Sequence, residues 1–221
     1  MNIKHHLDEA TLVSYAAGSI SQAMALVAAC HISFCPSCQK RASESEAIGG
    51  LLLDGLDEVD ISDDALDRVM ACLDNEPDIE PSIITNKIPP NFDDDLPKPL
   101  RECLQGSLDQ VPWKRIVPGV YYHDLPFKAE NGGVSKLLKI APGKSMLPHS
   151  HDGNELTLIL RGSFSDDVGR FTVGDIADLD DEIEHQPLVD SDEDCICLIA
   201  TDAPLKFSTL FGRLVQPMTG F

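Results

Sequence analysis

The chain has 221 residues, enough for one or two domains, and its 43% hydrophobic content is ordinary for a soluble globular protein. Its 37 acidic residues outweigh 17 basic ones, and the resulting formal charge of −20 excludes the basic surface of a nucleic-acid-binding protein. No apolar run is long enough to span a bilayer, and the first residues lack the apolar core of a signal peptide. We therefore expect a cytoplasmic protein that does not contact a membrane.

The first 75 residues predict a helical domain. Asp8 is a suitable N-cap for the first helix, and either Ser19 or Ser21 is suitable for the second. Apolar residues recur every three to four positions in the segments that follow these caps. The expected helices span 9–17, 22–31, 39–53 and 63–73.

The middle of the chain is rich in proline and in acidic residues. Six prolines fall between Glu76 and Pro99, and three aspartates follow one another from Asp93. Proline lacks an amide donor and disfavours helix before it, so this stretch predicts an extended, solvated segment. We place an acidic linker at 76–110.

The last part of the chain predicts a β domain over 111–221. Short segments rich in β-prone residues are separated by turns that contain glycine or proline, a pattern that is typical of a sandwich or a small barrel. The expected strands span 120–123, 136–140, 156–160, 195–201 and 207–211.

Three potential metal ligands lie within eight residues near the N-terminus. His31 precedes Cys35 by four positions, and Cys35 precedes Cys38 by three, so a turn presents both sulfurs to one ion. Tetrahedral zinc requires a fourth ligand, for which His6 is the natural candidate and His5 is the alternative. Two other interpretations are a buried pair of reduced cysteines and a redox dithiol. A neighbouring residue, Cys30, is expected in the core.

A second group of potential ligands lies in the β domain. His149, His151 and Glu155 share parity, so they point to one face of a strand. His185, on a later strand, completes a set of three imidazoles and one carboxylate. This set suits zinc, iron, manganese or nickel, and the sequence does not choose among these metals.

The N-terminal pattern of His6, His31, Cys35 and Cys38 resembles the zinc-binding anti-sigma domain, in particular that of the ChrR-type anti-sigma factors. The resemblance implies a four-helix module that wraps an extracytoplasmic-function (ECF) sigma factor and blocks its contacts with RNA polymerase. The four residues fall on the zinc ligands of that family.

The C-terminal pattern is similar to the cupin family, whose first motif is matched from Gly143 to Gly162. The second motif keeps Gly174 and His185 but departs from the family at three other positions, which are Asp180, Glu182 and Val189. ChrR-type anti-sigma factors carry such a domain after the zinc domain. The expected fold class is therefore α+β multidomain, with a four-helix zinc domain followed by a cupin-like antiparallel β-barrel or jelly roll.

The resemblance implies a regulator. The zinc domain would hold an ECF sigma factor inactive, and the cupin-like domain would sense an oxidative signal in a stress response and release it. The alternative hypothesis is a metal-dependent cupin dioxygenase or isomerase that is docked by its zinc domain. The spacing of Cys195 and Cys197 puts both sulfurs on one face of a strand. They are either small core residues or one of three alternatives: a strained disulfide, redox-active thiols or an extra soft metal ligand.

Overall fold

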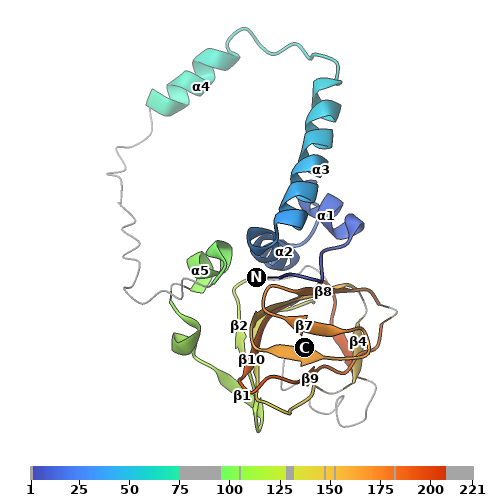
Figure 1. Ribbon diagram of the computed structural model, residues 1–221. Helices are drawn as coiled ribbons and strands as arrows, with labels where there is room; N and C mark the ends of the chain where they lie inside the picture. The colour runs from blue at the N-terminus through green and yellow to red at the C-terminus, as the bar shows by residue number, and fades with distance from the viewer. Residues whose placement is uncertain are drawn as a thin grey trace.

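The computed structural model describes residues 2–74, 96–104, 106–127, 132–146, 148–151, 153–181 and 183–207. Helices occupy the first part of the chain, and an antiparallel β domain follows them (Figure 1). The expected α+β class is confirmed. Of the helices in these ranges, none combines the length and the hydrophobicity that a membrane span requires.

All four expected N-terminal helices are present. Asp8 caps the first of them by accepting a hydrogen bond from the Thr11 amide at 2.5 Å, and Ser21, rather than Ser19, caps the second. Cys35 ends the second helix and also caps the third, so both are longer than expected. The helices are α1 (Glu9–Ala16), α2 (Gln22–Phe34), α3 (Pro36–Asp54) and α4 (Ala65–Asp74).

Helices α1, α2 and α3 pack together, whereas α4 stands apart from them (Figure 1). No described side chain of α4 is buried. Its apolar residues Leu66, Val69, Met70 and Leu73 are 49–69% exposed and lie on one face at spacings of three and four. The helix therefore presents an apolar stripe that nothing in the described chain covers.

The β domain is built from three antiparallel sheets. The largest has the order β1-β2-β3-β10-β5-β8, and the smaller ones have the orders β11-β4 and β7-β6-β9. Two isolated β-bridges add further pairings outside these sheets, one between His149 and His185 and one between Ser145 and Leu188. The strands are β1 (Lys114–Val117), β2 (Val120–Asp124), β3 (Ser135–Ile140), β4 (His149–His151), β5 (Glu155–Arg161), β6 (Ser163–Ser165), β7 (Arg170–Thr172), β8 (Ile176–Leu179), β9 (Leu188–Val189), β10 (Cys195–Thr201) and β11 (Leu205–Phe207).

The five expected strands correspond to β2, β3, β5, β10 and β11. The strand expected over 195–201 has those bounds, and those expected over 120–123, 136–140 and 156–160 each lie within a strand that is one or two residues longer. For the strand expected over 207–211, Phe207 is the last residue of β11, and residues 208–211 lie outside the described residues.

Both faces of the largest sheet are buried at its central strands β10 and β5. Along β10, Cys195, Cys197 and Ile199 point into the barrel, whereas Leu198 and Ala200 belong to a second core that includes residues of α2. This explains why β10 is apolar at nearly every position rather than at alternate ones. The N-terminal helices and the β domain thus share one continuous core.

The segment 76–110 departs from the extended linker that we expected. Residues 75–95 lie outside the described residues, but Lys98–Leu104 forms helix α5 and Leu108–Gln110 forms the short 3-10 helix η1. Leu100 is completely buried in the core that α2 shares with the sheet. The expectation was wrong for 98–104 and 108–110, because apolar burial outweighs the proline content. Pro99 occupies a first helical turn, where its missing amide costs little. The boundaries at 75 and 110 stay predictions.

Candidate metal centres

The N-terminal cluster is assembled from three segments. His6 precedes α1, His31 lies near the end of α2, and the two cysteines lie at the junction with α3. His6 Nδ1 is 3.2 Å from Cys35 Sγ and 3.8 Å from Cys38 Sγ, and His31 Nε2 is 3.3 Å from Cys38 Sγ. All four donor atoms lie within 4.8 Å of one another. Tetrahedral zinc places its nitrogen and sulfur ligands about 3.6 Å apart, so these distances fit a four-coordinate ion.

Burial shifts the pKa of two residues of this cluster, His31 and Cys38. His31 is completely buried, and desolvation lowers its pKa to about 4, against the opposing effect of the Gly174 carbonyl. Its imidazole is therefore neutral at pH 7 and available to a metal. Desolvation raises the pKa of Cys38 to about 11. A metal that binds here must therefore displace a proton from the thiol.

Two residues that are adjacent in sequence to the N-terminal cluster, His5 and Cys30, lie outside it. His5, the alternative fourth ligand, lies outside it: its ring packs against Phe171 with the centroids 4.2 Å apart, and its Nε2 is 3.1 Å from the Arg170 carbonyl oxygen. Cys30 is also separate, because it belongs to the apolar core, where desolvation raises its pKa to about 12.

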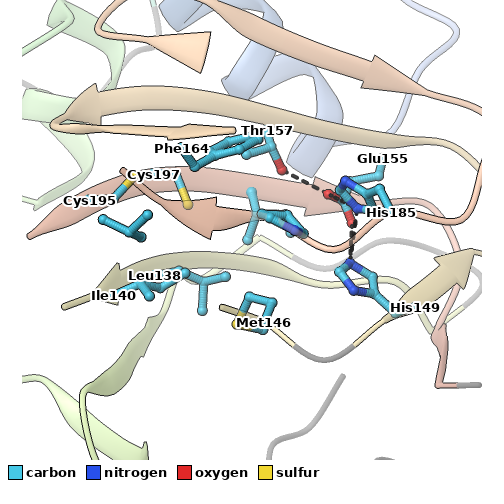
Figure 2. A pocket seen from close by; sticks show the side chains of 13 residues that line it. Leu138, Ile140, Met146, His149, Glu155, Thr157, Phe164, His185, Cys195 and Cys197 are labelled. Carbon is cyan, nitrogen blue, oxygen red and sulfur yellow. Dashed lines mark hydrogen bonds and ion pairs between the residues drawn. The ribbon is translucent and has the colours of Figure 1, made fainter. Parts of the chain in front are cut away.

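The second cluster lies inside the barrel. The Nε2 atoms of His149 and His185 are 3.1 Å apart, and each lies 3.9 Å from an oxygen of Glu155 (Figure 2). All three side chains are buried. Imidazole nitrogens about 2.1 Å from one ion lie about 3.0–3.4 Å apart, so this geometry also fits a metal. The fourth expected ligand, His151, lies in β4, but its side chain is outside the described part of the structure, so its role stays a prediction.

Two residues that the sequence did not indicate support this cluster. Asp166 has a side chain that is 1% exposed, and its Oδ2 is 3.0 Å from His185 Nδ1. Burial by itself raises the pKa of Asp166, but hydrogen bonds from His185 and from the Gly169 and Val168 amides outweigh it and hold the pKa below its usual range. The Thr157 hydroxyl donates to Glu155 Oε1 at 2.9 Å. Such contacts fix the orientation of metal ligands.

Replacing Asp166 by alanine is expected to weaken metal retention by the barrel cluster about tenfold to a hundredfold, because His185 loses the carboxylate that orients it. The measurement is competition of the full-length protein with a chromophoric chelator. The neighbouring Asp167, which is exposed, provides the control Asp167→Ala. Equal metal retention in the two variants would contradict the assigned role.

A cavity extends from the barrel cluster into the interior. It is lined by apolar side chains such as Leu138, Met146 and Phe164, and Figure 2 places Cys195 and Cys197 at the end away from the two histidines. Both cysteines are free and buried. Desolvation raises the pKa of Cys195 to about 12 and that of Cys197 well above its ordinary value.

We expect Cys195 to react with iodoacetamide near pH 8 roughly a thousandfold more slowly than a thiol of pKa 9, because only the thiolate is a nucleophile. Cys72, which is exposed on α4, is the internal comparison. Mass spectrometry of the folded protein after timed alkylation measures both sites. Labelling of Cys195 at the rate of Cys72 would contradict this prediction and favour the redox interpretation.

Known proteins are similar to this chain over nearly its whole length. Residues 104–204 match the model of the ChrR cupin-like domain. The anti-sigma-E factor ChrR of Cereibacter sphaeroides is 40% identical over 217 residues, which cover 98% of each chain. The chain belongs to the ChrR family. The crystal structure of Rhodobacter sphaeroides SigE in complex with the anti-sigma ChrR contains a chain that is 38% identical. That match has a TM-score of 0.77 and covers 91% of this chain and 100% of the other.

The departures from the second cupin motif do not disturb the part of the barrel that the structure describes. Asp180 and Val189 stand where cupins usually have other residues, yet Val189 is buried in β9 and His185 still reaches His149. The departures therefore leave the barrel and the described candidate ligands in place in this ChrR-family protein.

Proposed function

We propose that this chain is an anti-sigma factor that sequesters an ECF sigma factor in the cytoplasm through its N-terminal helices. One observation carries the proposal: the similarity to the anti-sigma-E factor ChrR runs through 98% of both chains. The fold agrees along the whole of a ChrR chain that was solved as a complex with SigE. This similarity does not favour the alternative of a cupin enzyme.

Exposed apolar side chains support a protein partner. Besides the stripe on α4, the second half of α3 exposes Ile48, Leu51, Leu52 and Leu53, each at 60–72%. Apolar surface of this extent is uncommon on proteins that function alone, and it is typical of an interaction site. The acidic charge of the chain also suits a partner with a basic, DNA-binding surface.

We propose zinc for the N-terminal cluster. Two thiolates and two imidazoles in a closed, four-donor arrangement are the ligand set of structural zinc. His6, His31, Cys35 and Cys38 would hold it, and the ion would tie the segment before α1 to α2 and α3. For the barrel cluster we propose a second divalent metal (zinc, iron, manganese or nickel) held by His149, Glu155, His185 and His151.

The cupin-like domain is proposed to sense an oxidative signal and to weaken the hold on the sigma factor. A sensor of this kind must favour one of two conformations of the chain. A chain of contacts between the two clusters supports such a link. It begins in the barrel cluster, where Asp166 contacts His185, and continues along the turn from Asp166 to Arg170. The carbonyl oxygen of Arg170 then contacts His5, which is next to the proposed ligand His6.

Co-expression with each ECF sigma factor of the source organism tests the proposal. We expect the tagged chain to retain one of them in a one-to-one complex that blocks transcription from a cognate promoter in a purified system. Retention of none of the candidates by folded, metal-loaded protein would contradict the proposed function.

A further inference from the structure

The segment that carries His6 is attached to the β domain by a buried carboxylate. Asp175, in the turn between β7 and β8, is completely buried. Its Oδ1 accepts hydrogen bonds from the amides of Lys4 at 2.6 Å and His5 at 3.0 Å. Its Oδ2 accepts from the amide and the hydroxyl of Thr172, each at 2.9 Å. One side chain thus holds the backbone immediately before His6 to the turn.

A second ligand of the N-terminal cluster contacts the same turn. His31 Nδ1 is 3.0 Å from the carbonyl oxygen of Gly174. A neutral imidazole has one donor and one acceptor, so an Nδ1–H that donates to this carbonyl leaves the Nε2 lone pair directed toward Cys38. The turn therefore fixes both the orientation and the tautomer of His31.

A third contact between the segment that carries His6 and the β domain is made by the side chain of His5. The His5 ring packs on Phe171, and a Cβ added at Gly169 would lie 3.2 Å from His5 Cε1. Asp178 adds a further hydrogen bond, from the Asp8 amide at 3.0 Å. Residues 4–8 are therefore held by the β domain on both sides of His6.

We propose that the turn Thr172–Asp175 of the cupin-like domain positions two ligands of the N-terminal metal site and so controls how long that site keeps its metal. Asp175 is a positioning residue that acts through the backbone before His6, and Gly174 acts through its carbonyl oxygen on His31. Outer ligand contacts of this kind usually change metal affinity about tenfold to a hundredfold. The inference rests on the proposed N-terminal metal site and not on sigma binding.

Cobalt exchange in the full-length protein tests this proposal. Cobalt bound by cysteine thiolates gives a charge-transfer absorption, and of the two described clusters only the N-terminal one contains cysteine. The rate at which excess EDTA removes this absorption therefore reports on that site alone. We expect Asp175→Ala to lose the absorption about tenfold to a hundredfold faster than the unmodified chain, and Asp175→Asn, which keeps one acceptor oxygen, to lie between them.

The control is Asp124→Ala, which removes a carboxylate from β2 that binds Lys114 and Lys136 and touches no residue of the segment 4–8. This variant should keep the cobalt release rate and the absorption spectrum of the unmodified chain. Cobalt release from Asp175→Ala that is no faster than from Asp124→Ala would overturn the proposal. If Asp175→Ala does not fold, the release rate of Asp175→Asn is compared with that of Asp124→Ala in the same way. A complete lack of thiolate-to-cobalt absorption in the unmodified chain would refute the N-terminal metal site itself. Capture of the sigma factor is measured in a separate experiment, so a failure of the proposed function is distinguished from a failure of this inference.

Discussion

Replacing both Cys35 and Cys38 by serine should remove one metal ion per chain and destabilise the N-terminal helices more than any other change proposed for this protein. The two thiolates are half of the proposed ligand set, and structural zinc contributes about 10–16 kcal/mol of apparent binding free energy in small zinc peptides. Helix α1 contributes little to the core by itself, since it buries only Leu12. Elemental analysis and thermal melting of the full-length protein measure the two effects.

The matched control is Cys30→Ala, which removes a buried thiol from α2 that lies outside the cluster. It should lower the melting temperature modestly through lost packing and leave the metal content unchanged. If the double serine variant keeps its full metal content and its melting temperature, the four residues do not form the proposed site.

Introducing charge into the apolar stripe of α4 should abolish sigma capture without affecting the fold. Leu66 and Met70 are 69% and 49% exposed, so Leu66→Asp with Met70→Asp disturbs no core of the described chain. Each apolar side chain buried by a partner contributes about 1.5–3 kcal/mol, and a buried unpaired carboxylate adds a penalty. We expect the dissociation constant to rise at least about a hundredfold.

The comparison for this variant is Ala71→Asp, which adds a carboxylate to another side of the same exposed helix. It should bind the sigma factor nearly as tightly as the unmodified chain, and the melting temperatures of both variants should match. Calorimetric titration provides the affinities. Undiminished binding by the double aspartate variant would remove α4 from the proposed interface.

Seven of the eight residues that the sequence proposed as ligands lie together in the two clusters, because their signals are local. The His31, Cys35 and Cys38 spacing requires only the end of one helix and the start of the next, and both are present. The expectation that His149, His151 and Glu155 share one strand was wrong, because His149 lies in β4 and Glu155 in β5. A bridge between His149 and His185 brings the candidate ligands together instead.

The supporting residues could not be predicted because their partners are distant in sequence. Asp166 is 19 positions from His185, and Asp175 is 170 positions from His5. A motif records which residues are close along the chain, whereas these contacts depend on how the helices pack on the sheet. The same packing made α5 unpredictable, since Leu100 is buried in a core to which the distant helix α2 contributes.

Calorimetric titration of the sigma factor into metal-loaded and metal-stripped full-length protein tests most directly whether a metal-closed N-terminal domain holds that partner. We predict a one-to-one complex with the zinc-loaded chain, at least about a hundredfold weaker binding after chelation, and recovery when zinc returns. Equal affinity in the two states would contradict the claim.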